Sequence, residues 1–140
     1  MINRLFFFCT DILQFLGKRF RLNYLQISVI VNLYIQGGLL TLSGIAPFVV
    51  QCYALTQHPS PDGEIKAAVL LVYALFYGWG FIRMLKHYKL PMEKAFYLCV
   101  EDLDKGCRKL NLSYKALNLI LFVGVWLLLI GVNAWLCLIL

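Results

Sequence analysis

The chain has 140 residues and a mass of 16.1 kDa, which is the length of one ordinary domain. Apolar residues make up 61% of it and charged residues 14%, whereas a soluble domain is about half apolar and a quarter charged. A chain this short has too little interior to bury the apolar excess. This composition excludes a soluble enzyme and a disordered tail.

Three long apolar runs predict the fold class. They cover residues 27–55, 65–84 and 117–140, and each exceeds the roughly 18 residues that cross the hydrocarbon of a bilayer as a helix. The runs are continuous and do not alternate with polar residues, which favours helices over a barrel. We therefore expect an all-α polytopic membrane protein, with residues 1–140 forming a single integral membrane domain and residues 56–64 an external loop.

Two amphipathic segments, residues 2–22 and 91–110, lie outside these runs. In both, apolar residues recur at helical spacing and charged residues fall mostly on the other side of the helix. We expect each to lie flat at the cytoplasmic membrane interface, with its apolar stripe toward the acyl chains. The apolar run near Met1 is shorter than that of a secretory signal, so we expect an unprocessed N-terminus.

The basic residues predict the orientation. Twelve of the thirteen Lys and Arg residues flank the same ends of the three apolar runs, and only Lys66 lies near the other ends. The positive-inside rule then places the N-terminus in the cytoplasm and the C-terminus outside a bacterial inner (plasma) membrane. The net charge of +6 indicates membrane lipid, not nucleic acid, as the partner of this surface. The candidate headgroup contacts are Lys18, Arg19, Arg21, Lys105, Arg108 and Lys109.

The two amphipathic segments, each with the run that follows it, align without a gap at an offset of 90 residues. Seven of 45 positions are identical, including Cys9 with Cys99 and Tyr24 with Tyr114. Apolar sequences also match by chance, so two interpretations stay open. One is a tandem duplication of a helix–span unit in the same orientation, and the other is a chance match between apolar segments of similar layout.

The first apolar run carries an unusual number of polar and small residues. Ser28, Asn32 and Gln36 are four residues apart and share one helix face. Such a stripe either lines a wet path or hydrogen-bonds to a neighbouring helix, and close packing is the commoner cause. The candidate pore-lining or helix-interface residues are Ser28, Asn32, Gln36, Gly37, Thr41, Ser43, Asn118 and Asn133. The candidate helix-packing residues are Ala74, Gly78, Gly124 and Gly131.

No catalytic site, metal site or cofactor site is predicted. Glu101, Asp102 and Asp104 are interpreted as a solvated helix face balanced by neighbouring basic residues. The size and the order of elements resemble the layout of small prokaryotic diacylglycerol kinases, which use Glu and Asn side chains at the inner end of their second span. Here residues 77–83 contain no carboxylate, so the resemblance is limited to the layout.

Function is expected to arise from assembly in the membrane. The first hypothesis is a homo-oligomer in which the polar face of the first run lines a pore or channel below a basic cytoplasmic collar. The alternative is a non-catalytic accessory or scaffolding subunit that uses this face to hold a larger membrane protein. A lipid-modifying enzyme of diacylglycerol-kinase-like layout ranks third.

Overall fold

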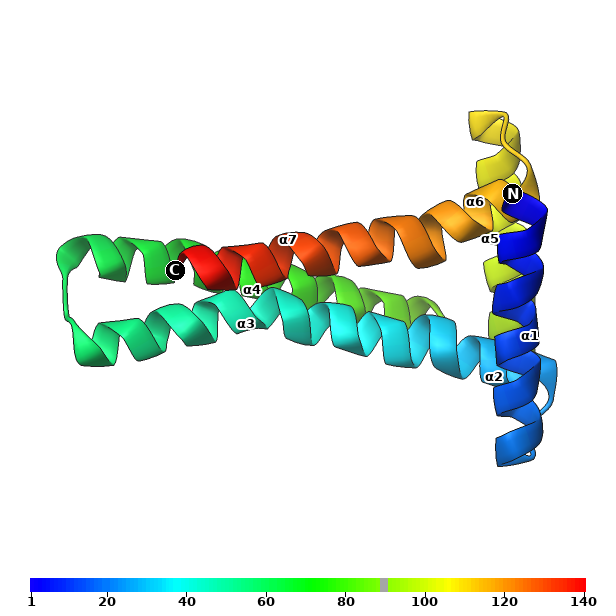
Figure 1. Ribbon diagram of the computed structural model, residues 1–140, viewed down its shortest axis with the longest axis horizontal. Coiled ribbons are helices and arrows are strands. Elements are labelled where there is room, and N and C mark those ends of the chain that lie inside the picture. Colours follow the sequence, from blue (N-terminus) through cyan, green and yellow to red (C-terminus); the bar gives the residue numbers. More distant parts are fainter. Residues whose placement is uncertain (89–90) are drawn as a thin grey trace.

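The computed structural model describes residues 1–88 and 91–140, and Lys89 and Leu90 of the second connection lie outside the described residues. The described part is helical and contains no strand. Three helices in it, Tyr24–Gln57, Pro61–His87 and Tyr114–Ile139, are long and apolar enough to cross a membrane. We call them the first, second and third span. They lie side by side, and two further helices cross one end of the bundle (Figure 1).

The chain consists of two similar units joined by a return helix. The first unit is α1 (Ile2–Phe20), α2 (Tyr24–Val29), the π-helical segment η1 (Ile30–Ile35) and α3 (Gln36–Gln57). The return helix is α4 (Pro61–His87). The second unit is α5 (Met92–Leu110), α6 (Tyr114–Leu119), the π-helical segment η2 (Ile120–Val125) and α7 (Trp126–Ile139). Except for the C-terminal ends of α3 and α7, every boundary in one unit lies 90 residues from its counterpart in the other.

The corner between each crossing helix and its span has the same construction in both units. Arg21 (φ 56°) and Asn111 (φ 54°) adopt the left-handed conformation that ends a helix. The next N–H then reaches back, from Leu22 to the Gly17 carbonyl at 2.8 Å and from Leu112 to the Cys107 carbonyl at 3.1 Å. The new helix is capped by Asn23 in the first unit and by Ser113 in the second.

All three spans begin before the apolar runs that predicted them, and the first two also end beyond them. The second span starts at Pro61 instead of residue 65, because the Ser60 hydroxyl accepts a hydrogen bond from the Gly63 N–H (3.1 Å) and proline suits the first helical position. The connection expected at residues 56–64 therefore shrinks to His58–Ser60. Similarly, the Ser113 cap starts the third span at Tyr114 instead of residue 117. The second amphipathic helix, α5, starts at Met92 instead of residue 91, because Pro91 occupies its N-cap position.

The first unit packs against the second through reciprocal contacts. α3 packs on both α4 and α7, and α1 and α5 each pack on α2 and on α6. α1 and α5 run in opposite directions across the ends of the spans (Figure 1). Val29 and Leu33 bury Ala95 of α5, and Leu117 packs with Leu103 and Cys107. Each crossing helix is thus held by the first turns of two spans.

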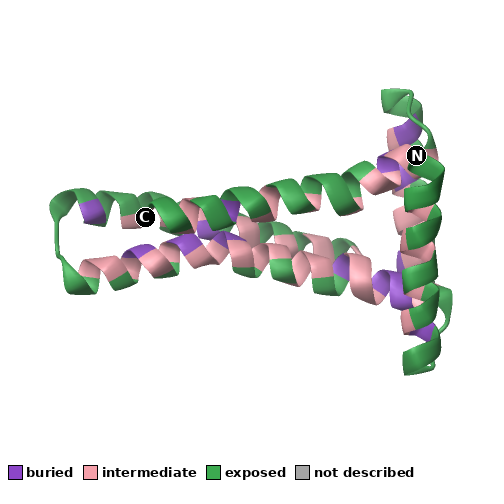
Figure 2. Cartoon of the chain, in the orientation of Figure 1, coloured by how far each residue is buried: buried purple, intermediate pink, exposed green. Residues whose placement is uncertain are grey.

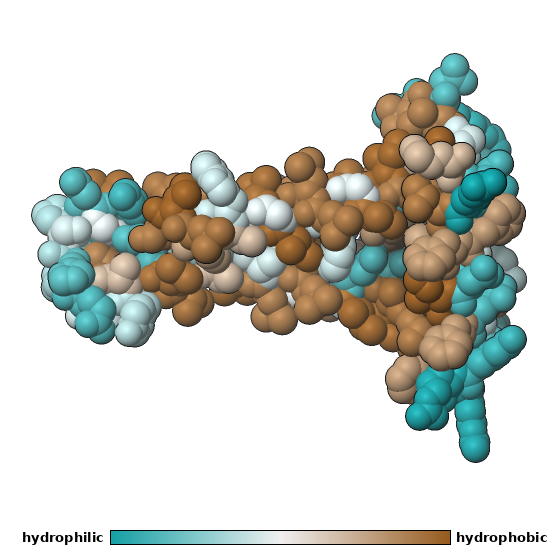
Figure 3. All heavy atoms as spheres, viewed as in Figure 1, coloured by the Kyte–Doolittle hydropathy of each residue, from teal (hydrophilic) through white to brown (hydrophobic). Residues whose placement is uncertain are grey.

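The outer surface of the bundle is apolar along most of its length. Few span residues are buried inside the chain (Figure 2). An apolar band covers the spans, and hydrophilic residues gather at both ends (Figure 3). Side chains such as Val72, Phe76 and Trp79 are more than half exposed. An apolar surface of this extent is compatible with a membrane location, because lipid and not water would surround it.

Candidate functional site

A fully buried amide, that of Asn133, joins the three spans. Its nitrogen donates to the Ser43 hydroxyl oxygen at 2.9 Å, and its oxygen accepts from the Tyr73 hydroxyl at 2.7 Å. Tyr77 closes the group, with its hydroxyl 3.1 Å from that of Tyr73. Ser43 in turn donates to the Leu40 carbonyl at 2.7 Å. We call Ser43, Tyr73, Tyr77 and Asn133 the inter-span network.

Close approach of the first and second spans supports this network. A methyl group built at Gly44 would overlap the ring of Tyr77, so only glycine lets that ring lie against the α3 backbone. About two helical turns from Gly44 toward the α1/α5 end, a Cβ built at Gly37 would lie 3.0 Å from the Met84 side chain and 3.1 Å from the Phe81 ring. Thr41 lies on the same stretch and donates to the Gly37 carbonyl of its own helix at 2.9 Å.

The two π-helical segments are connected by hydrogen bonds from side chains to backbone carbonyls. A π turn displaces the regular backbone ladder and leaves a carbonyl without its usual donor. The Gln36 amide nitrogen donates to the Phe122 carbonyl of η2 at 3.1 Å. The Trp126 ring nitrogen donates to the Gln36 carbonyl, directly after η1, at 2.9 Å. Side chains of the first and third spans therefore donate to each other's backbone beside the two π-helical segments.

A cavity of about 400 Å³ lies between α1, α5 and the first turns of the first and third spans. Its walls are mostly apolar, and its lining contains no Asp, Glu, Lys, Arg or His residue. The polar lining groups come from Thr10, Tyr24, Ser28, Asn32, Gln36, Tyr114 and Asn118. Ser28 is 4% exposed, and its hydroxyl has no hydrogen-bond partner among the described residues. We call this space the inner cavity.

The structure places most of the predicted polar residues in either the inner cavity or the inter-span network. Ser28, Asn32, Gln36 and Asn118 line the inner cavity, and Ser43 and Asn133 belong to the inter-span network. Among the predicted packing residues, Ala74 is buried. Gly78 and Gly131 face open space, and the nearest atom to a Cβ at Gly124 belongs to its own helix, 3.9 Å away. These three glycines have no close neighbour from another helix of the described chain.

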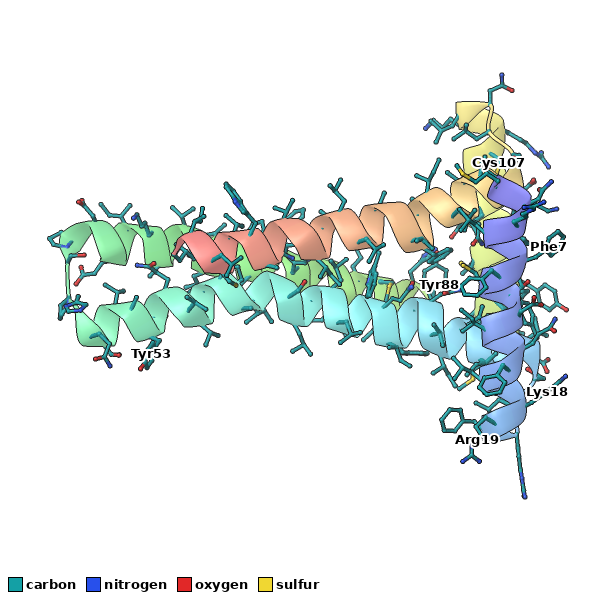
Figure 4. The ribbon with its side chains drawn as sticks, viewed as in Figure 1. Phe7, Lys18, Arg19, Tyr53, Tyr88 and Cys107 are labelled. Carbon is teal, nitrogen blue, oxygen red and sulfur yellow. The ribbon has the colours of Figure 1, made fainter. Side chains whose placement is uncertain are left out.

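The predicted headgroup residues lie at the α1/α5 end. Lys18 and Arg19 are at the C-terminal end of α1, away from the spans (Figure 4). Arg21 forms the left-handed cap of α1, and Lys109 lies in the last turn of α5. Lys105 and Arg108 pair with acidic residues of their own helix. A further cation, Lys115 of α6, lies 4.5 Å from the ring centre of Phe7 and joins α6 to α1.

Three carboxylates of α5 are engaged by neighbouring side chains. Glu101 pairs with Lys105 at 2.8 Å and Asp104 with Arg108 at 2.7 Å, one helical turn apart. Asp102 accepts from the Tyr88 hydroxyl at 3.0 Å and lies 3.1 Å from the His87 ring nitrogen, which lowers the pKa of its carboxyl. Within the described residues no His, Cys, Asp or Glu group has the arrangement of a metal site.

Sequence reasoning missed three polar anchors. Tyr73 and Trp126 were not among the predicted site residues, yet both donate hydrogen bonds between spans. Gln51, 6% exposed, donates to the Gly63 carbonyl at 3.1 Å and fixes the far ends of α3 and α4 together. The available signal for Gln51 was its place in an apolar run, because hydrocarbon offers an amide no hydrogen-bond partner.

No protein-family model, curated protein or solved structure matches the chain in comparisons of its sequence and fold. Its function is therefore inferred from its own contacts.

Proposed function

We propose that this protein is a non-catalytic accessory or scaffolding subunit that holds a larger membrane partner. The observation that carries the proposal is that the polar face of the first span is already used inside the chain. Gln36 and Ser43 make hydrogen bonds with the third span. Polar residues that tie helices together in this way give a stiff bundle and leave less of the face free to line a conduction path.

We also propose that the chain arose by tandem duplication of a helix–span unit. The shared element boundaries at an offset of 90 residues support this. So do two hydrogen bonds, Ser43 with Asn133 and Gln36 with Trp126, which join positions 90 residues apart. The reciprocal packing of α1 on α6 and of α5 on α2 is the pattern that a two-fold pair makes.

A face of the third span is suited to a partner helix. Gly124 and Gly131 are one heptad apart, and the residues between and beyond them on that face, Leu128 and Trp135, are 66% and 59% exposed. A glycine inside a helix costs about 1 kcal/mol relative to alanine. In a membrane, close approach of a second helix offsets that cost. We call Gly124, Leu128, Gly131 and Trp135 the glycine seam.

The proposed orientation follows the charge distribution. The α1/α5 end carries almost all of the basic residues, and the connection at the other end carries none. We place the α1/α5 end in the cytoplasm of a bacterial cell, where α1 and α5 lie against anionic lipid headgroups. In this position the basic residues of α1 and α5 would hold the bundle at a fixed depth in the membrane, where the partner meets it.

The test is purification of the tagged protein from native membranes in mild detergent. We expect a stoichiometric second protein, and Gly124→Leu with Gly131→Leu should release it. Gly38→Leu is the matched control, because Gly38 also faces open space but lies on the first span. A chain that purifies alone as a monomer would contradict the proposal.

The pore hypothesis gives a different result in the same preparation. The purified protein would then be an assembly of identical copies, and liposomes containing it would conduct ions. Asn32→Leu combined with Gln36→Leu would abolish that conductance. The subunit proposal expects no conductance from the chain alone.

A further inference from the structure

The inner cavity has the size and the lining of a ligand site. Its volume of about 400 Å³ lies within the range of small-molecule pockets, and most of its wall is apolar. Leu13 and Leu103 approach from α1 and α5, and Leu33 and Phe122 from the two π-helical segments. Elements of both units line it, so it forms only when the units are assembled.

The polar groups of the cavity line one face of each of two spans. Tyr24, Ser28 and Asn32 are four residues apart and follow one face of the first span, and Tyr114 and Asn118 follow the corresponding face of the third. In Figure 3, hydrophilic residues lie between the apolar bands of the two spans, close to α1. The result is an apolar space with amide and hydroxyl groups facing it from two sides.

The chemistry of these groups selects an uncharged ligand. Amides and hydroxyls donate and accept hydrogen bonds but do not compensate a full charge, and an uncompensated charge is costly in an apolar site. No basic residue is in the lining: the basic residues nearby lie at the ends of α1 and α5, and Lys115 of α6 lies over the rings of Phe6 and Phe7. The buried Ser28 hydroxyl, which has no partner in the described chain, would gain one from a bound hydroxyl or carbonyl group.

We propose that the inner cavity binds one molecule of an uncharged lipid, whose hydroxyl or carbonyl group meets Ser28, Asn32 and Asn118 while its chain occupies the apolar part. A membrane lipid is favoured over a water-soluble molecule because the walls belong to the spans and to two amphipathic helices. Ile12 and Phe15 of α1 remain 43% and 69% exposed beside it, as expected of a helix lying in acyl chains. This site goes beyond the subunit function, and its test needs no protein partner.

The test uses three photoreactive probes in vesicles that contain the whole protein. All have the same diazirine-bearing C16 chain, and they end in a hydroxyl, a carboxylate or a trimethylammonium group. After irradiation, mass spectrometry locates the labelled residues. We expect the alcohol to label cavity residues of α1, α5 and η2 about tenfold more than the charged probes do, and excess unlabelled hexadecanol to compete.

Variants connect the labelling to the cavity. Ser28→Ala and Asn32→Leu should each reduce labelling by the alcohol about fivefold, which corresponds to one lost hydrogen bond. Thr41→Val is the matched control, because the Thr41 hydroxyl lies outside this cavity and bonds to its own helix. Leu13→Phe should fill the space and reduce labelling without removing a polar group.

Thermal unfolding separates ligand binding from a structural role. Ser28→Ala removes a hydroxyl that has no partner, so the variant without probe should unfold at or above the wild-type temperature while its labelling falls. Equal labelling by the three probes, labelling confined to lipid-facing residues such as Phe76 and Trp79, or wild-type labelling of the three cavity variants would each overturn the proposal. These outcomes would leave the subunit proposal intact, because that proposal is tested separately by release of a partner from the glycine-seam variants.

Discussion

The Asn133 amide donates a hydrogen bond to the Ser43 hydroxyl over 2.9 Å, and the two residues occupy corresponding places 90 positions apart in the two units. The Trp126 ring nitrogen and the Gln36 carbonyl, at 2.9 Å, have the same separation. The first and third spans are therefore aligned in register by two polar contacts along an otherwise apolar interface.

The inter-span network predicts energetic coupling between Ser43 and Asn133. We expect Asn133→Ala to lower the free energy of unfolding by about 1–3 kcal/mol, because it leaves buried hydroxyls without their partner. Ser43→Ala should cost less, and a double-mutant cycle should give a coupling of about 0.6–1.7 kcal/mol, as for other hydrogen bonds between membrane helices. Unfolding in mixed SDS micelles measures these values. Additive effects of the two substitutions would show that the contact contributes nothing.

Trp126→Phe tests the hydrogen bond that follows η1. The phenyl ring keeps most of the apolar contact but cannot donate to the Gln36 carbonyl, so we expect a loss of about 1 kcal/mol. Trp135→Phe is the control within the isolated chain, because Trp135 is 59% exposed and makes no hydrogen bond to a described residue. The same SDS titration should separate the two variants, and equal losses would contradict the assigned role of Trp126.

Glycines of the first span should respond in opposite ways to the same change. Gly44→Ala places a methyl group against the Tyr77 ring, and we expect it to cost about 1–3 kcal/mol through separation of α3 and α4. Gly38→Ala faces open space and should stabilise the helix by up to about 1 kcal/mol. Thermal unfolding of both variants in one detergent gives the comparison. Similar effects would mean that α3 and α4 pack more loosely than described.

The contact between α5 and the end of α4 should weaken in acid. The hydrogen bond from His87 lowers the pKa of Asp102, so the folded chain holds this carboxyl ionised to lower pH than the unfolded chain does. The resulting stability is present above the unfolded pKa of about 3.9 and is lost as pH falls through the folded value. The effect is small, because the Asp102 side chain is 37% exposed.

Thermal unfolding between pH 7 and pH 2.5 measures this linkage. Asp102→Asn should begin less stable and lose less as the pH falls. The control is Glu101→Gln, which removes the exposed i,i+4 pair with Lys105 instead. If Asp102→Asn and the wild type followed parallel curves, the Asp102 contact with His87 would not affect stability.

The proposed orientation is checked by cysteine labelling in intact cells. In a background with the five native cysteines replaced, Ser60→Cys should react with a membrane-impermeant maleimide added outside. Lys105→Cys on α5 should react only after the membrane is opened. The reverse pattern would place the α1/α5 end outside and would contradict the use of the basic residues as a cytoplasmic platform.

Much of the helical layout could be predicted from the length and the hydropathy of the apolar runs. A run of apolar residues long enough to cross a bilayer has few other stable arrangements, which is why three spans were predicted and three candidate spans are present. The predicted limits of the spans were less accurate. Asn23, Ser60 and Ser113 cap helices outside the apolar runs, so hydropathy alone placed the starts of all three spans too late.

The contacts of the candidate site were predictable only in part. Asn133 was expected to have a partner because an unpaired amide is costly in hydrocarbon, but nothing in the sequence said that Ser43 and Tyr73 would supply it. The π-helical segments also gave no signal, since Ile30–Ile35 and Ile120–Val125 read as ordinary apolar helix. Each segment lies beside a hydrogen bond from a side chain of the opposite span, and such pairing between distant residues is invisible to local patterns.

The exchange of contacts between the two units affects how the chain is made. α1 is synthesised before the spans, yet one of its two supports, α6, follows about a hundred residues later. Until the third span is in place, α1 lacks that support and α5 has only α2 to pack against. The corner structure therefore forms only after the third span has been made, and a chain stalled before that point would leave both crossing helices half-supported.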